Sequence, residues 1–412
     1  MDERNCPVCK SIDISRFLDL GMQPPANDLS TTAEMAASAG KFPLLLMICN
    51  NCLYVWLDHK VPAAYLFSNN TYLTGISSET RDHMKNLSDD CIATCKLNSS
   101  SKILDIASND GTLLAFFKES GMQVMGIDPS APASELANTK GINTICDFFN
   151  EESAGRILLE FGKVDIITAT NVITHVSDPV SFLGNCKKIL KDSGTIVLEF
   201  YNFEKIIENN AFDQIYHEHI SYFNFTVFYG ILKNAGLQPY KVAETRAQGG
   251  SLRVFVGQMN RHEPDDSVQR TLHSEGGPKN ILRRYISFPK KVIERKNEIN
   301  ALLKDELDAG SVIIGYGASA KATVISNYLG FTPDTIRAIA DKSPIKIGRF
   351  IPGVGIPIIS PEQINDLNPD LIIIFAWNIK NEIIDTLPSL IREKCRALSL
   401  IPVIKFYTIQ KT

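Results

Sequence analysis

The sequence places two histidines around a glutamate in the segment Tyr216-His217-Glu218-His219, which follows an apolar run at residues 196–200. Among the side chains, imidazole has the pKa closest to neutrality, so histidine is suited to accept and return a proton. Taken alone, the segment is equally consistent with a loop of solvated polar residues. The chemical interpretation is favoured because a predicted cofactor site precedes the segment and a predicted anion-binding turn follows it.

Two CxxC pairs, Cys6/Cys9 and Cys49/Cys52, lie near the N-terminus. Each pair lets two thiolates approach one ion from a tight turn, and two pairs complete the four-sulfur shell of a tetrahedral zinc site. Their separation exceeds the roughly 15–20 residues of common zinc ribbons, so an excursion is needed between them, for which residues 21–27 are a candidate. The alternative is a chance pairing of structural cysteines. Four thiolates leave no position for water, so we expect a structural zinc ion.

The composition is that of a globular protein, since 44% of the 412 residues are hydrophobic and 21% are charged. It allows two or three domains with a sizeable core. The net charge of −4 disfavours a nucleic-acid binder with a broad basic surface. No apolar run approaches the roughly 18 residues that span a bilayer, and the first residues lack the features of a secretory signal. We therefore expect a cytoplasmic protein without a membrane segment, whose cysteines are metal ligands or buried thiols.

Residues 98–260 alternate strand-like and helix-like segments, which predicts a doubly wound α/β sheet. Ligands of such sheets bind beyond the carboxyl ends of the strands. Strands are expected at 103–107, 123–128, 142–146, 164–170 and 195–200, with an antiparallel pair at 240–245 and 252–257. The residues predicted to contact a cofactor at this edge are Asp105, Asn109, Gly111, Asp128, Asp147, Phe148 and Asn171.

The ends of the first two strands indicate which cofactor binds. Asp128 ends the second strand with a carboxylate, which suits a ribose diol, and the first turn has a single glycine, Gly111, which suits a ligand without a pyrophosphate. This combination favours S-adenosylmethionine over NAD. We expect Asn109 and Gly111 to lie against the methionine portion. Asp147 and Phe148 are expected to frame the adenine.

Residues 261–412 are expected to form a helical connector and a second α/β unit. The expected elements are an amphipathic helix at 280–307 and strands at 311–315, 335–341 and 370–375. The first of these strands runs into a glycine-containing turn, Gly315-Tyr-Gly317-Ala-Ser319-Ala-Lys321. Such a turn aims backbone N–H groups and a helix N-terminus at an anion. It is weak evidence alone, because glycine also serves tight packing.

The motifs occur in an order that resembles the S-adenosylmethionine-dependent C-methyltransferases of deoxysugar biosynthesis. The resemblance covers nearly the whole chain. The motifs that carry it are Cys6-x-x-Cys9, Phe17-Leu-Asp-Leu-Gly21, Pro25-Ala-Asn27, Phe42-Pro-Leu, Cys49-x-x-Cys52, Ser108-Asn-Asp-Gly-Thr112, Asn171-Val-x-x-His175, Tyr216-His-Glu-His219 and Gly315-Tyr-Gly-Ala-Ser-Ala-Lys321. One departure is Leu53, where the family more often has glycine, and it affects the local turn rather than the metal.

This resemblance implies three domains. They are a zinc-binding N-terminal domain with connecting helices at 1–97, a central class I methyltransferase domain at 98–260, and a helical connector with a C-terminal Rossmann-like domain at 261–412. It also implies a substrate, a nucleotide-linked 4-keto-6-deoxysugar, which receives the methyl group on a ring carbon next to the ketone, C3 in preference to C5. The nucleotide and the sugar stereochemistry are not indicated by any residue pattern.

The resemblance further implies roles for individual residues. A carbon next to a ketone becomes nucleophilic after losing a proton, so a base and polar groups near the enolate oxygen are required. His219 is implied as the base, with Glu218 and Tyr216 holding the substrate and the base in place. His175 and Tyr72 are candidates to contact the sugar or stabilise the enolate. Without the resemblance, a capping or core role would be the better interpretation of His175.

The C-terminal domain is expected to hold the nucleotide end of the substrate rather than a second redox cofactor. Methyl transfer requires no hydride, whereas a nucleotide-diphosphate sugar carries a pyrophosphate that needs neutralisation. Gly317, Ser319 and Lys321 are the candidates in the turn, and Asn378 lies beyond the last expected strand. Ala320 stands where the usual dinucleotide fingerprint has its third glycine.

Other functions are compatible with parts of the pattern. A sugar O- or N-methyltransferase needs the same cofactor but no carbon acid. A non-catalytic nucleotide-sugar-binding protein would not need the intact Tyr-His-Glu-His segment. A zinc-ribbon methyltransferase acting on nucleic acid is disfavoured by the acidic balance, so we expect no nucleic-acid partner. A monomer is the default for the oligomeric state.

We predict that Cys6, Cys9, Cys49 and Cys52 bind one zinc ion. Elemental analysis of purified protein should give about one equivalent, because four thiolates saturate a single tetrahedral ion. Cys6→Ser should lower the zinc content and the unfolding temperature, whereas Cys146→Ser, outside the two pairs, should change neither. A fully folded, zinc-free wild-type preparation would refute this prediction.

Overall fold

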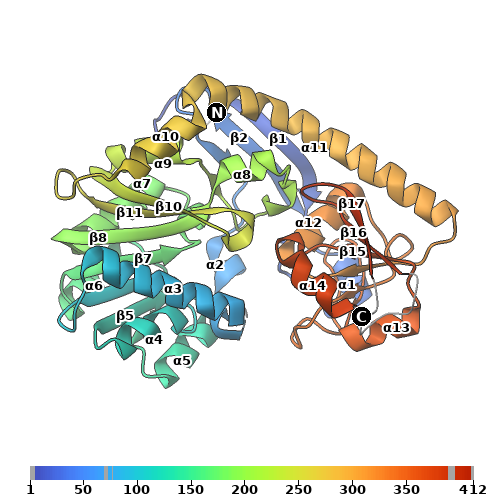
Figure 1. The fold of residues 1–412 in the computed structure, drawn as a ribbon, viewed down its shortest axis with the longest axis horizontal. Helices are drawn as coiled ribbons and strands as arrows, with labels where there is room; N and C mark the ends of the chain where they lie inside the picture. Colours follow the sequence, from blue (N-terminus) through green and yellow to red (C-terminus); the bar gives the residue numbers. More distant parts are fainter. Residues whose placement is uncertain (1–4, 69–72, 77, 388–394, 410–412) are drawn as a thin grey trace.

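The computed structural model describes residues 5–68, 73–76, 78–387 and 395–409. Within these residues the strands form a four-stranded, a seven-stranded and a six-stranded sheet. In Figure 1 the seven-stranded sheet lies on the left and the six-stranded sheet on the right, and the N-terminal strands β1 and β2 (bounds below) lie between them at the top. Tyr72, one of the sugar-contact candidates, lies outside the described residues.

The four-stranded sheet joins the cysteine pairs to the histidine-containing segment. Its antiparallel strands are, in order, β1 (Ile14–Gln23), β2 (Phe42–Cys49), β3 (Val55–Leu57) and β9 (Ser221–Tyr222). The chain between the two cysteine pairs is therefore mainly a strand pair with α1 (Ala33–Ala37) in its connection. Pairing of Ile14 with Cys49 brings the second CxxC beside the first. Because β9 follows His219 closely, this sheet also anchors that histidine.

The turn after the fourth cysteine explains the departure from the family pattern. Leu53 has a φ of 60°, in the left-handed region that favours glycine, and its N–H donates to the Cys49 carbonyl at 2.9 Å. A left-handed conformation costs a non-glycine residue roughly 1–2 kcal/mol. Leu53 is also buried, and burying a leucine side chain stabilises by about 1.5–3 kcal/mol, which offsets that cost.

The seven-stranded sheet confirms the expected doubly wound fold. Its order is β10-β11-β8-β7-β4-β5-β6, with β10 and β11 antiparallel to their neighbours and the rest parallel. The strands are β4 (Lys102–Ile106), β5 (Gln123–Asp128), β6 (Thr144–Cys146), β7 (Val164–Thr170), β8 (Leu190–Tyr201), β10 (Leu237–Thr245) and β11 (Ser251–Gln258). The strand order reverses at β4, between β5 and β7, and such a switch point opens a crevice at the carboxyl ends.

Helices cover both faces of this sheet. On one face, apolar side chains of α3 (Ser78–Cys95) and α4 (Thr112–Glu119) pack in one cluster with strand residues such as Ile103 and Phe255. The other helices are α5 (Ala131–Thr139), α6 (Glu151–Glu160), α7 (Pro179–Ile189), α8 (Phe203–Glu208) and α9 (Phe225–Asn234). Several begin at side-chain caps, which satisfy N–H groups left free in the first turn. Asn150, for example, accepts from the Ser153 N–H at the start of α6.

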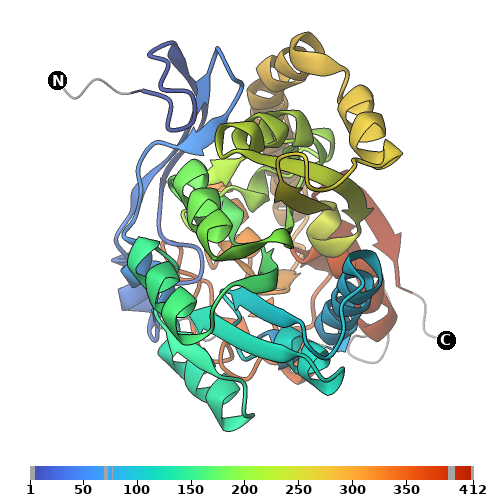
Figure 2. The same ribbon diagram turned by 90° about the vertical axis from the view of Figure 1, so that its left-hand side faces the viewer.

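Short elements connect the loops around the carboxyl edge of this sheet. They are the helix α2 (Ala63–Phe67) and the 3-10 turns η1 (Thr74–Ile76), η2 (Ile173–His175), η3 (Phe212–Gln214) and η4 (Ala247–Gly249). Figure 2 views the molecule from the left-hand side of Figure 1, so the central sheet lies in front and the C-terminal unit behind it.

The C-terminal unit is a mostly parallel sheet reached through a long helix. Helix α10 (Asp266–Glu275) leads into α11 (Gly277–Asp308), which runs along the top of Figure 1 and confirms the helix expected at 280–307. The sheet order is β14-β13-β12-β15-β16-β17, with only β17 antiparallel. The strands are β12 (Ile313–Tyr316), β13 (Ile339–Ala340), β14 (Ile358–Ile359), β15 (Leu371–Ile374), β16 (Arg396–Ser399) and β17 (Lys405–Thr408).

Helices α12 (Ala320–Leu329), α13 (Ile364–Leu367) and α14 (Lys380–Thr386) accompany this sheet. The strand expected at 335–341 is much shorter than predicted. Thr335 N–H donates to the Thr332 carbonyl in a turn, hydrogen bonds to β12 start at Arg337, and only Ile339 and Ala340 are paired as β13. Apolar residues before β13 had made the strand look longer than it is.

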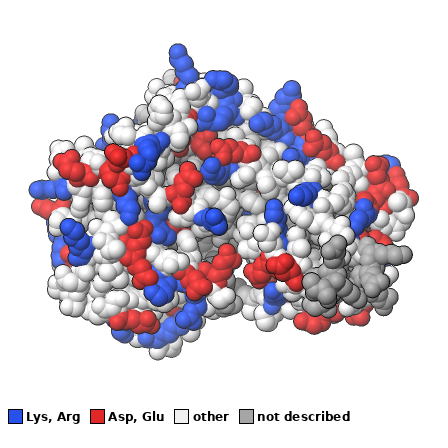
Figure 3. All heavy atoms as spheres, in the orientation of Figure 1, with Lys and Arg blue, Asp and Glu red and all other residues white. Residues whose placement is uncertain are grey.

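The surface and the helix lengths give two further observations. On the face drawn in Figure 3, basic and acidic side chains are interspersed rather than gathered in one basic area. Among the described residues, no helix combines the length and apolar character needed to cross a bilayer. The domain boundaries at residues 97 and 260 stay a prediction.

Candidate active site and zinc site

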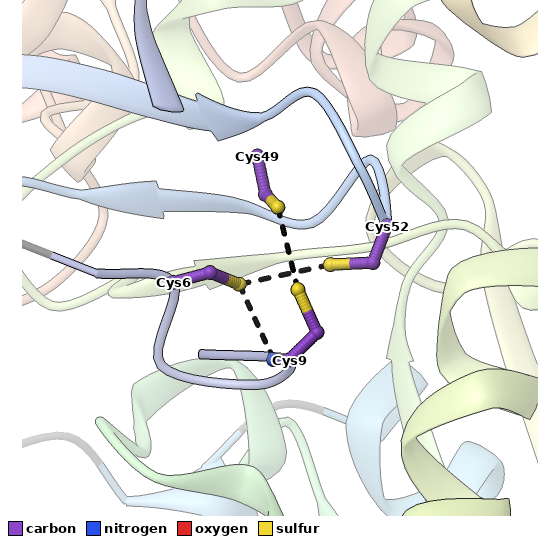
Figure 4. Close-up of side chains that lie close together, drawn as sticks. All are labelled: Cys6, Cys9, Cys49 and Cys52. Carbon is purple, nitrogen blue, oxygen red and sulfur yellow. Dashed lines mark hydrogen bonds between the residues drawn. The ribbon is translucent and has the colours of Figure 1, made fainter. Parts of the chain in front are cut away.

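The four N-terminal cysteines converge on one point. Sγ of Cys6 lies 3.6 Å from Sγ of Cys52, and Sγ of Cys9 lies 3.5 Å from Sγ of Cys49 (Figure 4). All four sulfur atoms lie within 4.8 Å of one another. A tetrahedral zinc site with Zn–S bonds of about 2.3 Å has sulfur–sulfur edges of about 3.8 Å, so the cluster fits one zinc ion. Four thiolates complete a tetrahedral shell and leave no open position for water, which agrees with a structural role.

A cavity of about 750 Å³ lies along the carboxyl edge of the central sheet. Its volume is within the range of about 300–1,000 Å³ typical of small-molecule sites. The sequence-predicted residues that line it are Asp105, Asn109, Asp128, Asp147, Phe148, Asn171, His175 and Asn378. Those not found in its lining are Gly111, Tyr216, Glu218, His219, Gly317, Ser319 and Lys321. The cavity therefore joins the predicted cofactor edge to Asn378 and Ile379 of the C-terminal unit.

Two backbone N–H groups hold the Asp128 carboxylate in place at the cavity edge. Its carboxylate accepts from the backbone N–H groups of Asn109 at 2.9 Å and Ser130 at 2.8 Å. Burial raises the pKa of Asp128, although these two bonds oppose the shift. Each carboxylate oxygen retains capacity for a further donor, as a ribose diol would supply.

The first turn of the central sheet is held in an uncommon conformation. Ala107 and Asn109 have φ values of 56° and 51°, and Asn171, after β7, has a φ of 58°. Positive φ is uncommon for residues other than glycine, and such positions cluster at functional sites. Gly111 has a φ of 75°, and an added Cβ would lie 3.2 Å from Ala137 and Ile142. Gly111 thus shapes the turn and the start of α4.

Two further carboxylates line the cavity in different surroundings. Asp105 is buried and accepts from the Thr168 hydroxyl at 2.7 Å, and burial raises its pKa to about 7. Asp147 is more exposed, accepts from the Phe148 N–H at 2.8 Å and pairs with Arg156 at 2.9 Å. A mixed polar and aromatic wall of this kind suits a purine ring.

His219 lies in a dry, aromatic environment behind the cavity wall. Its Nδ1 is 2.8 Å from the Gln214 carbonyl oxygen, and its ring centroid is 4.0 Å from that of Tyr216, 4.9 Å from Tyr201 and 5.2 Å from His175. A carbonyl can only accept, so Nδ1 carries the proton and Nε2 has the free lone pair. Burial lowers the pKa of His219 well below its usual value, so the ring is neutral at pH 7.

His175 stands between His219 and the cavity. Its ring stacks on that of His219 on one side and on Phe67, also in the cavity wall, at 5.2 Å on the other. Burial lowers the pKa of His175 to about 4, so this imidazole is also neutral at pH 7. The two histidines thus form a neutral pair that reaches from the cavity into the core.

Glu218 and His217 point to different partners. Glu218 accepts at Oε1 from the Asn27 side chain at 2.9 Å, while its Oε2 is buried without a protein partner. Burial raises the pKa of Glu218. The ring of His217 packs against Phe42 of β2, with ring centroids 6.0 Å apart. His217, which was not among the predicted site residues, therefore belongs to the contact with the N-terminal sheet.

The glycine turn of the C-terminal unit lies against the segment that precedes the histidine motif. Gly317 has a φ of 92°, and an added Cβ would lie 2.9 Å from Cβ of Ala376. The Ser319 hydroxyl, at the start of α12, is buried without a protein partner. Burial lowers the pKa of Lys321, and the nearby Asp213 carboxylate opposes the shift. Lys321 also contributes to the lowered pKa of His219, which places its charge close to that ring.

A chain of charged residues missed by the sequence reasoning lies at one end of the cavity. His83 Nε2 is 2.5 Å from Glu199 Oε1, and both residues line the cavity. Arg253 pairs with Glu199 at 2.9 Å and with Asp90 at 3.2 Å, and Lys241 pairs with Asp90 at 2.9 Å. These pairs tie α3 to β8, β10 and β11. The sequence offered one weak indication of this chain of pairs, which is that Glu199 is an acidic residue inside an otherwise apolar strand.

Three protein-family models match the chain in consecutive order. They describe a putative zinc binding domain at residues 6–67, a methyltransferase domain at residues 80–242 and a C-methyltransferase C-terminal domain at residues 246–402. The chain is similar to the C-methyltransferase NovU of Streptomyces niveus, with 28% identity over 409 residues, 99% of this chain and 97% of NovU. With the sheet order and the cysteine cluster, these matches confirm the resemblance: the chain is an S-adenosylmethionine-dependent methyltransferase with an N-terminal zinc-binding domain.

Other similarities are confined to part of the chain. The ubiquinone biosynthesis O-methyltransferase of Bradyrhizobium sp. (strain ORS 278) is 35% identical over 107 residues, which are 24% of this chain and 40% of that protein. Among solved structures, the magnesium protoporphyrin IX methyltransferase of Synechocystis PCC 6803 with bound S-adenosylmethionine is 14% identical and has a TM-score of 0.33. The match covers 43% of this chain and 79% of that one.

We predict that Asp128→Ala weakens S-adenosylmethionine binding by about 1–3 kcal/mol, because two hydrogen bonds to ribose hydroxyls are lost. Isothermal titration calorimetry measures this change directly. Asp147→Ala, at the more exposed end of the cavity, should have a smaller effect. An unchanged affinity in Asp128→Ala would exclude it from the ribose site.

Proposed function

We propose that this methyltransferase adds a methyl group to a ring carbon next to the ketone of a nucleotide-linked 4-keto-6-deoxysugar, C3 in preference to C5. The observation that carries the proposal is the buried, neutral His219 ring, whose Nδ1 proton is held by the Gln214 carbonyl. Such a ring presents a basic nitrogen without first having to lose a proton. O-methylation of a hydroxyl needs no carbon acid, but a base can take the proton of a hydroxyl as well, so the position of the new methyl group in the product separates the two reactions.

In this proposal His219 removes the proton from the carbon next to the ketone. Because His219 does not itself line the cavity, this role requires the sugar carbon to reach Nε2 past the His175 ring. A neutral base in a dry site suits this step, because water does not compete for the proton. Tyr216, whose ring packs on His219, holds the base in place. Glu218, fixed by Asn27, contributes a free carboxyl oxygen that can orient the substrate. His175, in the cavity wall, and Tyr72, outside the described residues, are assigned to the sugar or the enolate oxygen.

S-adenosylmethionine supplies the methyl group from a sulfonium, which is already a good leaving group, so alignment provides much of the rate. The residues assigned to hold it are those around the carboxyl ends of the strands. Asn109 and Gly111 are assigned to its methionine portion, and Asp128 to the ribose. Asp105 and Asn171 are assigned to the same edge. Asp147 and Phe148 are assigned to the adenine, in agreement with their place in the cavity lining.

The nucleotide end of the substrate is assigned to the C-terminal unit. Asn378 supports this assignment, because it lines the same cavity as the cofactor-edge residues. The turn with Gly317, the unpartnered Ser319 hydroxyl and Lys321 supplies groups that can neutralise a pyrophosphate. The free state of all nine cysteines suits the reducing cytoplasm, where we place the protein.

One experiment separates the proposal from its alternatives. The protein is incubated with S-adenosylmethionine and a panel of nucleotide-linked 4-keto-6-deoxysugars, and products are analysed by mass spectrometry and NMR. A new carbon-bound methyl group next to the ketone is the expected result. A methyl group on oxygen or nitrogen would indicate the sugar O- or N-methyltransferase, and binding without turnover would indicate a non-catalytic binding protein.

We predict that His219→Asn lowers kcat by about 10²–10⁴-fold, the range expected when a general base is removed. The same variant should lose solvent-deuterium exchange at the carbon next to the ketone, measured by NMR without the methyl donor. His217→Asn is the matched control, since this ring packs against Phe42 instead, and its exchange should persist. Turnover and exchange near wild type in His219→Asn would remove it from the role of base.

We predict that Lys321→Ala mainly raises KM for the nucleotide sugar, because a pyrophosphate is bound similarly in the ground state and the transition state. Steady-state kinetics with both substrates varied measures the effect. KM for S-adenosylmethionine should not change. Normal nucleotide-sugar binding by this variant, or tight NAD binding by the protein, would contradict the assignment of the turn.

A further inference from the structure

The contacts around η3 lead to an inference about the proposed base, and this inference rests on the proposed function. We infer that the C-terminal α/β unit, through Trp377 and Asp213, holds His219 in the tautomer and orientation that leave Nε2 free to accept a proton. Trp377 and Asp213 are positioning residues, which act through the backbone of η3.

The first contact fixes the tautomer. Gln214 ends η3, and its carbonyl accepts the Nδ1 proton of His219 at 2.8 Å. The orientation of this carbonyl depends on the conformation of η3, because a 3-10 turn of three residues has few internal hydrogen bonds. If the carbonyl turned away, the Nε2-protonated tautomer would no longer be disfavoured, and a protonated Nε2 cannot act as a base.

The second contact fixes η3 from the C-terminal unit. Asp213 is fully buried, and its Oδ2 accepts from the Trp377 indole N–H at 2.8 Å. The indole follows β15 of the C-terminal sheet and Asp213 lies in η3, so this bond joins two segments 164 residues apart in sequence. Oδ1 of Asp213 has no hydrogen-bond partner, so among the described residues the Trp377 indole is the side chain that donates to this carboxylate. The Lys321 charge and the backbone N–H groups of Asp213 and Gln214 also favour this carboxylate, and the indole is the hydrogen-bond donor that ties it to the segment after β15.

Aromatic packing supports the same contact. Phe212, the first residue of η3, meets Tyr328 of α12 edge-on, with ring centroids 5.4 Å apart. The C-terminal unit therefore holds η3 through two neighbouring residues, one by packing and one by a hydrogen bond. The two contacts come from different elements, which restricts rotation of the turn.

The Trp377 ring also supports η3 indirectly. Gly249 packs against it so closely that an added Cβ would lie 2.4 Å from the ring. This glycine belongs to the turn in which the Gln248 carbonyl accepts from the Gln214 side chain at 3.1 Å. Gln248 and Asn378, the residue after Trp377, both line the cavity. The indole thus acts on Gln214 in two ways. It packs against the turn that accepts from the Gln214 side chain, and it donates to the neighbouring residue, Asp213.

The test measures the tautomer directly in the full-length protein by ¹⁵N NMR of the histidine ring nitrogens. Signals of His219 are identified by their loss in His219→Asn, and the wild type should show a protonated Nδ1 and an unprotonated Nε2. Trp377→Phe keeps an aromatic ring but removes the donor, and should give a mixture of both tautomers. Its kcat should fall about tenfold with KM for S-adenosylmethionine unchanged, as expected for the loss of one buried hydrogen bond.

Matched variants separate positioning from simple destabilisation. Asp213→Asn keeps an acceptor for the indole N–H and should retain the wild-type tautomer and most of kcat. Asp213→Ala removes the acceptor and should reproduce Trp377→Phe, which provides a second route if that variant folds poorly. Tyr407→Phe, on β17 of the same unit, should change neither the His219 tautomer nor kcat.

A wild-type tautomer and kcat in both Trp377→Phe and Asp213→Ala would overturn the inference. The NMR measurement requires no substrate. A failure of the proposed sugar methylation would therefore appear in the wild-type product analysis, while the tautomer result would still decide whether Trp377 and Asp213 position His219.

Discussion

The proposed chemistry depends on one hydrogen bond, from Nδ1 of His219 to the carbonyl of Gln214. Burial keeps this imidazole neutral, but neutrality alone does not decide which nitrogen carries the proton. The carbonyl decides it, and the surrounding structure holds both groups. β9, just after His219, is a strand of the N-terminal sheet, and η3, which ends at Gln214, contacts the C-terminal unit. The proposed base, which lies in the central region, is thus held in place by the N-terminal sheet on one side of its segment and by the C-terminal unit, through η3, on the other.

The same burial favours the neutral forms of the titratable side chains in the site. Burial lowers the pKa values of His175 and His219, and it raises those of Glu218 and Tyr216. All four shifts favour the neutral form. A group of neutral acids and bases can pass a proton without creating isolated buried charges, which are costly. Burial lowers the pKa of Lys321 in the same way, while the nearby Asp213 carboxylate opposes this shift.

The sequence predicted the central fold well because its signals are local. Short apolar runs mark the buried parallel strands, and polar residues mark where they end, so Asp128 and Asn171 could be placed at the cavity edge from sequence alone. The CxxC spacing likewise defined the zinc ligands. Contacts between distant segments have no such signal. Nothing near Asp213 indicates that Trp377 lies against it, and the link between Asn27 and Glu218 was visible only as two motifs in one order. The side-chain direction that takes His217 to Phe42 and His219 to Gln214 depends on tertiary packing.

The zinc site is structural, yet a short path of hydrogen bonds connects it to the proposed base. Tyr54, two residues after Cys52, is fully buried, and its hydroxyl lies 2.6 Å from that of Ser221 in β9. The Ser221 hydroxyl donates to the Val176 carbonyl at 2.7 Å, so Tyr54 must be the donor in the first bond. This path ends beside both histidines, since Val176 follows His175 and Ser221 lies two residues after His219. An ion held by the four cysteines would fix the turn that carries Tyr54, and Tyr54 in turn holds the two backbone segments on which the histidine pair stands. In this arrangement a metal with no open coordination position would still contribute to the geometry of the proposed proton transfer.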